Sequence, residues 1–181
     1  MSYLITLPGL GGSGEAHWQT LWERGNPAFR RFAPSDWDRP DFADWARALD
    51  RAVSHAPPRP ILVAHSLSCL LVAHWSKRSA VPIAGAFLVA APDPMGSNFP
   101  PEGASFANLP DDRLPFPALM IASSDDPYGT VAGARRRAQL WGAEFLDIGA
   151  AGHINTASGH GPWPEGRALL EAFCAGAARP G

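Results

Sequence analysis

Short apolar runs alternate with longer segments of mixed polarity along the chain. Five apolar runs of strand length predict β-strands over 3–7, 60–64, 83–90, 118–122 and 143–148. A weaker candidate covers 30–33, where two arginines suit a strand at the edge of a sheet. Continuous rather than alternating apolar runs are typical of strands covered on both faces. The pattern therefore predicts a mostly parallel sheet of about six strands.

The segments between these runs carry helical periodicity. Apolar residues recur at intervals of three and four over 42–53, and Asp41 and Asp44 suit the first turn of such a helix. Further helices are predicted over 66–77, 130–141 and 163–177. Strands that alternate with helices are typical of βαβ units. We therefore expect an α/β fold with a doubly wound sheet and helices on both faces, in a single domain over 1–181.

The segment 92–116 departs from this alternation. It contains six prolines and no clear periodicity, and it follows a predicted strand. Its start should therefore lie at the carboxyl edge of the sheet, where open α/β proteins bind ligands. Two interpretations remain open. The segment forms the roof of a pocket, with Phe99, Phe106 and Phe116 as its apolar lining, or it is an ordinary surface loop.

Charge and composition argue against several classes of partner. Fifteen Lys and Arg against seventeen Asp and Glu give a net charge of −2, so no basic excess favours nucleic acid. No apolar run is long enough to span a bilayer, and an N-terminus without an Arg before Arg24 is unlike a signal peptide. Cys69 and Cys174 match no metal spacing and favour a reducing compartment. We expect a cytoplasmic monomer or small homo-oligomer, with no nucleic-acid or membrane partner.

The segment Ala64–Ser68 carries the strongest chemical signal. Ser66 lies between a predicted strand and a predicted helix, where a sharp turn exposes a serine hydroxyl beside free backbone N–H groups. The residues two before and two after such a serine must be small, and they are usually glycine. Here they are Ala64 and Ser68. Ser66 is therefore a candidate nucleophile, and the alternative is a serine that only caps the helix.

A serine nucleophile needs a base and an acid that orients the base. In this fold class the chain order is serine, acid, histidine, and each follows a strand. Asp126 follows the fourth long strand and is favoured over the adjacent Asp125 as the acid. His153 follows the fifth and is favoured over His160 as the base. His65, beside the serine, is interpreted as a structural histidine.

The glycine-rich segment 8–14 follows the first strand and suits an oxyanion hole. We expect one donor to be the backbone N–H of Leu67 and the other to come from Gly9 or Leu10. The segment lacks the Lys-Ser/Thr of a P-loop and the spacing of a dinucleotide site. We therefore expect no cofactor and no metal. His17 and Trp18 edge the pocket in one interpretation, whereas in the other Trp18 serves only in helix packing.

These motifs together resemble the small single-domain serine hydrolases of the α/β-hydrolase superfamily, the retinoblastoma-binding-protein-9 and YdeN-like group. The resemblance rests on segments 7–11, 13–18, 64–67, 124–128 and 152–153. It implies a minimal α/β-hydrolase fold without a large cap domain, a triad of Ser66, Asp126 and His153, and no cofactor. Ser68 departs from the pattern of the family, which usually has glycine there.

The motifs and the resemblance lead to one main functional hypothesis. We expect a serine hydrolase that cleaves a small-molecule ester, with an amide as the second choice, through an acyl-enzyme intermediate. One alternative is a weakly active or inactive hydrolase fold that binds a protein or ligand. Another is acyl transfer to an acceptor other than water, which would use the same residues.

Overall fold

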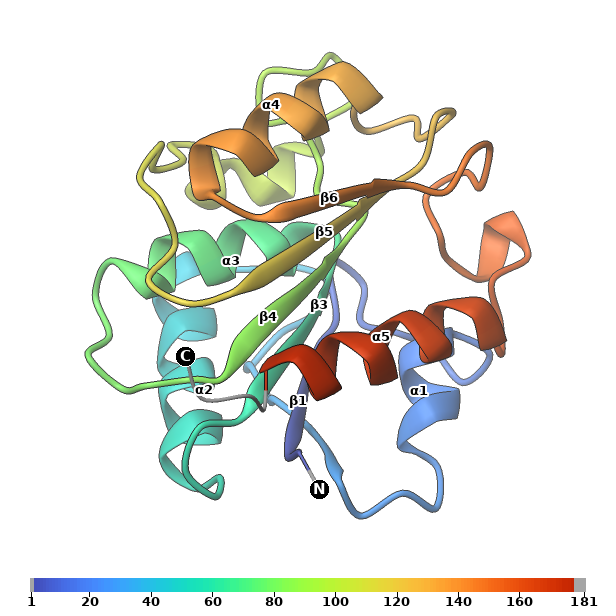
Figure 1. The fold of residues 1–181 in the computed structure, drawn as a ribbon. Helices are drawn as coiled ribbons and strands as arrows, with labels where there is room; N and C mark the ends of the chain where they lie inside the picture. The colour runs from blue at the N-terminus through green and yellow to red at the C-terminus, as the bar shows by residue number, and fades with distance from the viewer. Residues whose placement is uncertain (1, 178–181) are drawn as a thin grey trace.

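Six parallel strands form one sheet in the computed structural model, which describes residues 2–177 (Figure 1). The strands are β1 (Leu4–Leu7), β2 (Phe29–Arg31), β3 (Ile61–His65), β4 (Gly85–Val89), β5 (Ala118–Ala122) and β6 (Glu144–Asp147). Their order across the sheet is β2-β1-β3-β4-β5-β6, and every neighbouring pair is parallel. This confirms the predicted doubly wound parallel sheet. The edge position of β2 agrees with the prediction for 30–33, although the strand begins one residue earlier.

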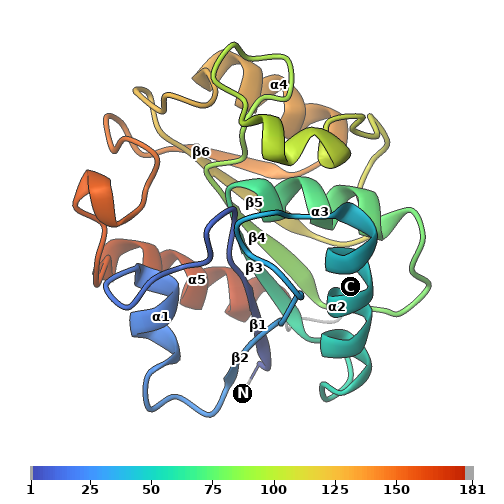
Figure 2. The ribbon, with the colours of Figure 1, turned by 180° about the vertical axis from the view of Figure 1, so that it is seen from behind.

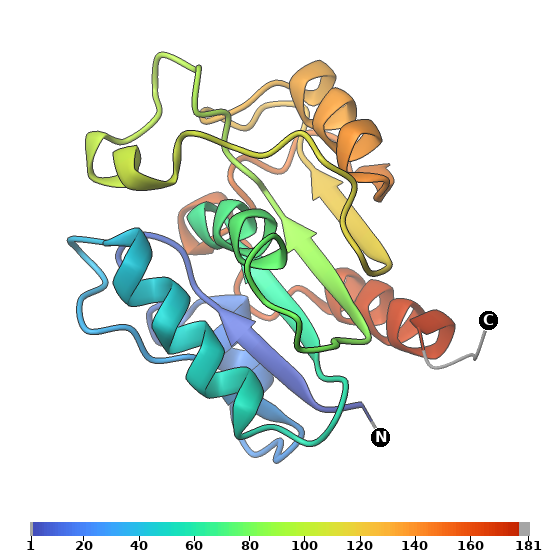
Figure 3. The ribbon, with the colours of Figure 1, turned by 90° about the vertical axis from the view of Figure 1, so that its left-hand side faces the viewer.

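Helices cover both faces of the sheet, as Figures 2 and 3 show. They are α1 (Trp18–Glu23), α2 (Phe42–Ser54), α3 (Leu67–Ser76), α4 (Val131–Trp141) and α5 (Pro164–Ala177). One buried apolar cluster joins α2, α3 and α4 to the sheet, and a second joins α1 and α5 to the opposite face. The bounds of four helices lie within a residue of the prediction. The sequence pattern misses α1, because six residues are too few to establish a helical period.

Large aromatic side chains fill both layers between helix and sheet. Trp45 and Trp141 are buried against the face that α2, α3 and α4 cover. On the other face, the fully buried Trp18 packs against Trp22 and Trp163. Trp18 therefore belongs to the core, as one of the two interpretations predicts. Burial of this much aromatic surface stabilises the packing of the helices on both faces of the sheet.

The segment 92–116 contributes Pro92 and Pro100 to the lining of a pocket, but not the three phenylalanines predicted to line it. It contains a 3₁₀ helix, Pro101–Phe106, and the Phe106 side chain is fully buried against Phe42 and Trp45. Phe99 and Phe116 also pack on this core, so the prediction that the three phenylalanines line a pocket is wrong. A large aromatic ring gains more from complete burial than from lining a partly open cavity.

Two further expectations depend on the range of residues described. The predicted domain over 1–181 includes residues 1 and 178–181, which lie outside the described residues. Within 2–177, no helix has both the length and the apolar character needed to cross a bilayer.

Candidate active site

A cavity of about 220 Å³ lies at the carboxyl edge of the sheet, where the loops after several strands meet. From β1 the chain continues to β2, which lies on one side of β1 in the sheet. It then returns to β3 on the other side of β1 and continues from there to β4. Such a reversal of strand order separates the loops and is where open α/β sheets bind ligands. The lining residues are Gly9, Leu10, Gly12, Ser13, His17, His65, Ser66, Leu67, Pro92, Pro100, Tyr128, His153 and Asn155.

Ser66 occupies the sharp turn between β3 and α3. Its backbone has φ 55° and ψ −125°, a conformation that residues other than glycine rarely adopt. The Ser66 N–H donates to the carbonyl of Val89 at 2.9 Å, which ties the turn to the neighbouring strand β4. The Ser66 hydroxyl makes no capping bond to α3, although the residue stands at the N-cap position. The alternative of a simple capping serine is therefore contradicted.

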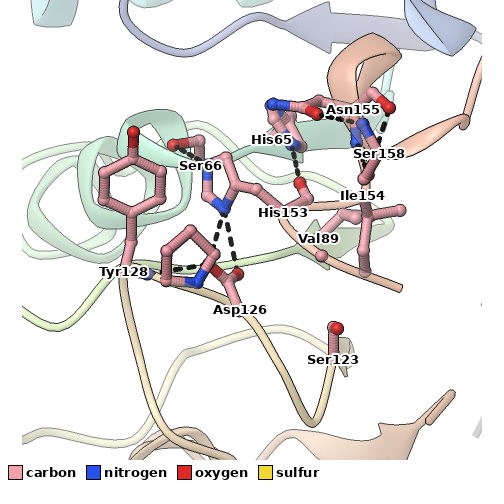
Figure 4. A network of polar contacts seen from close by, with 12 residues as sticks. His65, Ser66, Val89, Ser123, Asp126, Tyr128, His153, Ile154, Asn155 and Ser158 are labelled. Carbon is pink, nitrogen blue, oxygen red and sulfur yellow. Dashed lines mark hydrogen bonds and ion pairs between the residues drawn. The ribbon is translucent and has the colours of Figure 1, made fainter. Parts of the chain in front are cut away.

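The Ser66 hydroxyl contacts His153 instead, as Figure 4 shows. Ser66 Oγ lies 2.8 Å from His153 Nε2. On the other side of the imidazole, His153 Nδ1 lies 2.9 Å from both carboxylate oxygens of Asp126. The side chains of His153 and Asp126 are only 9% and 6% exposed. The turn after β3, the loop after β5 and the loop after β6 thus bring three predicted residues into one line of contacts.

Asp125 has a different set of contacts. Its carboxylate accepts from the Ser123 hydroxyl and from the Gly152 N–H, each at 2.7 Å. These two hydrogen bonds lower the pKa of the Asp125 carboxyl. Since Gly152 directly precedes His153, Asp125 ties the loop after β5 to the loop that carries the imidazole. Of the two candidate acids, only Asp126 contacts the imidazole of His153 within residues 2–177.

The other two histidines compared with His153, namely His65 and His160, make no hydrogen bond to the Ser66 hydroxyl. His160 lies beside Ser158 and Trp163, on the loop that leads to α5. His65 is buried, and its Nε2 lies 3.0 Å from the His153 carbonyl oxygen. Burial, aided by the imidazoles of His153 and His17, holds the pKa of His65 well below its ordinary value. His65 is therefore a neutral residue that supports the backbone of His153, in keeping with its predicted structural role.

The loop after β1 packs tightly on the turn at Ser66. A Cβ atom at Gly9 would lie 2.8 Å from Ser66 Cβ, which is closer than real side chains approach. The same atom would lie 3.4 Å from the Leu67 nitrogen, so Gly9 and the first N–H of α3 are neighbours. Within residues 2–177, the N–H groups of Leu67 and Leu10 have no hydrogen-bond acceptor. These donors border the cavity beside the Ser66 hydroxyl.

The cavity also includes residues to which the sequence assigns no role. The Tyr128 ring contacts the His153 ring edge-on, with 4.6 Å between their centres, and the Tyr128 N–H donates to Asp126 Oδ1 at 2.9 Å. Asn155 follows His153 by two residues and also lines the cavity. The only feature of the sequence that points to these two residues is that each follows a predicted site residue, Asp126 or His153, by two positions. His17 does border the cavity, in keeping with the interpretation that places it there.

Neither a metal cluster nor a reactive thiol accompanies the serine. Residues 2–177 contain no group of three His, Cys, Asp or Glu side chains arranged to hold a metal ion. Cys69, three residues beyond Ser66, is completely buried, and burial raises the pKa of its thiol. The thiolate form needed for nucleophilic attack is therefore strongly disfavoured.

Several solved structures share this fold. A YdeN-like hydrolase from Pectobacterium atrosepticum is 32% identical, with a TM-score of 0.88 over 98% of this chain and 92% of that one. The ydeN gene product of B. subtilis is 17% identical, with a TM-score of 0.75 over 97% and 100%. A monoacylglycerol lipase from Paleococcus ferrophilus is 13% identical, with a TM-score of 0.71 over 95% and 93%.

A protein-family model also matches the sequence. The model described as serine hydrolase matches residues 4–172, which include every strand of the sheet and most of α5. No curated protein sequence matches the chain. The similarity to the Pectobacterium protein extends over nearly the whole length of both chains and agrees with the family model. The chain therefore belongs to the serine hydrolase family and is an enzyme that acts by hydrolysis.

Proposed function

We propose that this enzyme cleaves a small, uncharged carboxylic ester with Ser66 as nucleophile, His153 as general base and Asp126 as the residue that orients His153. The observation that carries the proposal is the line of contacts from Ser66 Oγ through both nitrogens of His153 to the Asp126 carboxylate. A carboxylate at Nδ1 favours the tautomer with the proton on that atom. The Nε2 lone pair is then free to accept the serine proton.

The reaction follows from this arrangement. Ser66 Oγ bonds to the ester carbonyl carbon while its proton passes to His153 Nε2. The imidazolium then gives the proton to the departing alcohol as the carbon–oxygen bond breaks, which leaves an acyl group on Ser66. Water attacks this acyl group and loses its proton to His153, and Ser66 regains the proton as the acid departs. The N–H groups of Leu67 and of Gly9 or Leu10 bind the oxyanion in both tetrahedral states.

The size and charge of the cavity support a small neutral substrate. Its volume of about 220 Å³ is below the range of about 300–1,000 Å³ typical of pockets for drug-sized ligands. Of the described residues that line it, none is Lys, Arg, Asp or Glu. Burial, aided by the nearby Arg31 and His153, lowers the pKa of His17 to about 4, so this imidazole is also neutral at neutral pH.

Two more observations support the reaction class and the domain organisation, respectively. The lipase among the structural relatives is named for a reaction at an ester, although at 13% identity it shares only the fold with this chain. One sheet with both faces covered supports a single domain over the described residues 2–177. The volume of the cavity limits the size of the acyl group.

Replacing the nucleophile tests the proposal directly. Ser66→Ala should lower kcat for p-nitrophenyl acetate by roughly 10⁴–10⁶, as in other enzymes whose catalytic residues act as a unit. Steady-state hydrolysis followed at 405 nm, which is about the absorption maximum of p-nitrophenolate, measures the loss. The exposed Ser124 serves as the control, and Ser124→Ala should retain wild-type turnover. Wild-type turnover in Ser66→Ala would contradict the proposal.

The two adjacent aspartates should differ sharply in their effect on the same reaction. Asp126→Asn should lower kcat by about 10⁴, because an amide at His153 Nδ1 favours the wrong tautomer. Asp125→Asn should lower kcat by less than about tenfold, because its amide oxygen can still accept from Ser123 and Gly152. Steady-state kinetics of both variants provide the comparison. The opposite ranking would assign the role of orienting acid to Asp125.

The neutral imidazole of His17 should make the fold less stable in acid. In the unfolded chain His17 binds a proton below pH about 6.5, but in the folded chain only below about 4. The free energy of unfolding should therefore decrease as pH falls between these values, by up to about 1.4 kcal/mol per pH unit from this group. In His17→Asn, the amide oxygen can still accept from the Gln19 N–H, but the titrating group is gone.

Urea unfolding of both proteins at pH 7.0, 6.0, 5.0 and 4.5 (about the span of the shift) measures this contribution. The wild type should lose more stability than His17→Asn as the pH decreases. Other titrating groups are present in both proteins, so the difference between the two profiles reports His17 together with its coupling to His65, whose pKa the His17 imidazole helps to lower. Parallel profiles would show that His17 titrates at its ordinary pKa in the folded protein.

A further inference from the structure

Ser68 stands where the turn around a nucleophilic serine usually has glycine. It lies in the first turn of α3 and is completely buried. Its hydroxyl donates a hydrogen bond of 2.6 Å to the carbonyl oxygen of Pro8, which is 60 residues earlier in the chain. A short, buried hydrogen bond therefore joins the helix of the nucleophile to the loop after β1.

The position of Pro8 gives this bond its significance. The Pro8 carbonyl and the Gly9 N–H belong to the same peptide group, and a trans peptide group is planar with its C=O and N–H pointing in opposite directions. No peptide bond in the described residues is cis. Whatever holds the Pro8 oxygen therefore also sets the direction of the Gly9 N–H and the path of the chain into Leu10. These are the two positions from which the second oxyanion donor is expected.

A second contact limits the same peptide from the other side. Gly9 has no side chain, and its Cα lies so close to Ser66 that a Cβ would approach Ser66 Cβ to 2.8 Å. This contact sets how near the loop can come to the nucleophile, but it does not prevent the peptide from rotating. The Ser68 hydroxyl supplies that restraint, since it binds the carbonyl oxygen itself. Glycine in place of Ser68 would still allow the close packing of Gly9 on Ser66, but it could not hold the Pro8 carbonyl oxygen.

We propose that Ser68 is a positioning residue that orients the Pro8–Gly9 peptide for oxyanion binding. The inference rests on the proposed ester hydrolysis at Ser66, because attack of Ser66 on the ester carbonyl forms the oxyanion at this place. Ser68 itself does not touch the substrate, since it is completely buried and does not line the cavity. Its hydroxyl acts through the peptide that it holds.

Ser68→Ala removes the hydroxyl, and Ser68→Gly restores the residue usual at this turn. Removing an oxyanion donor altogether costs about 10²–10³ in kcat, so a donor that is present but less well oriented should cost about tenfold. Both variants should show this loss in kcat with p-nitrophenyl acetate, with KM changed by less than about twofold. Ser76→Ala is the matched control, because the Ser76 hydroxyl donates to the Ala73 carbonyl at 2.7 Å near the other end of α3.

A ketone that mimics the tetrahedral state distinguishes positioning from a general loss of structure. 1,1,1-Trifluorobutan-2-one can accept Ser66 Oγ at its carbonyl carbon and place an oxyanion in the proposed hole. Its inhibition constant should rise in Ser68→Ala and Ser68→Gly by the same factor by which kcat falls. Ser76→Ala should leave kcat and the inhibition constant within about twofold of wild type.

Two results would overturn the inference while leaving ester hydrolysis at Ser66 intact. One is an unchanged kcat in Ser68→Ala and Ser68→Gly. The other is a lower kcat without a matching change in ketone affinity, which would place the effect of the hydroxyl on a different step. Failure of the proposed function gives a separate result, in which the wild type neither hydrolyses the ester nor binds the ketone. That result would overturn both proposals.

Discussion

The strained backbone at Ser66 is the constraint on which the site depends. A non-glycine residue at φ 55° costs on the order of 1–3 kcal/mol, so the surrounding structure must hold it in place. The hydrogen bond from its N–H to Val89 and the close packing of Gly9 do so. The helix that follows is buried along most of its length against the sheet. In return, this conformation turns the hydroxyl away from its own helix and toward His153.

The remaining parts of the site reach this hydroxyl because all six strands are parallel and end at the same edge. The loops after β5 and β6 are tied to each other by Asp125 and Ser123, which bind the N–H groups of Gly152 and Ala151. His65 supports the carbonyl of His153 from the turn itself. These polar contacts are short, and their partners lie on different loops. They restrict the position of the imidazole to within reach of both the serine and Asp126.

Much of the fold and the main features of the site can be predicted from the sequence, because the signals that define them are local. Continuous apolar runs identify the strands, and the small residues two positions before and after Ser66 mark a tight turn. The order of serine, acid and histidine after successive strands brings their loops to one edge. Asp125 and Asp126 are adjacent and chemically identical, so the sequence pattern favours Asp126 without excluding its neighbour. Only the directions of their side chains in the fold separate them.

The features that the sequence does not reveal depend on contacts between distant segments. Phe106 has the same local signal whether it lines a cavity or fills the core, and only its contacts with Phe42 and Trp45 decide the outcome. Tyr128 and Asn155 border the cavity only because the loops that carry them fold over it. The bond from Ser68 to Pro8 spans 60 residues, and a serine in place of glycine gives no hint of its partner.

Covalent labelling with a fluorophosphonate probe tests the central claim most directly, because the probe reacts only with a serine that is activated beside a formed oxyanion site. Intact mass followed by peptide mapping would identify the modified residue. The account predicts one adduct per chain, on Ser66, and its loss in His153→Ala. An adduct on another serine, or no adduct on the folded protein, would contradict it.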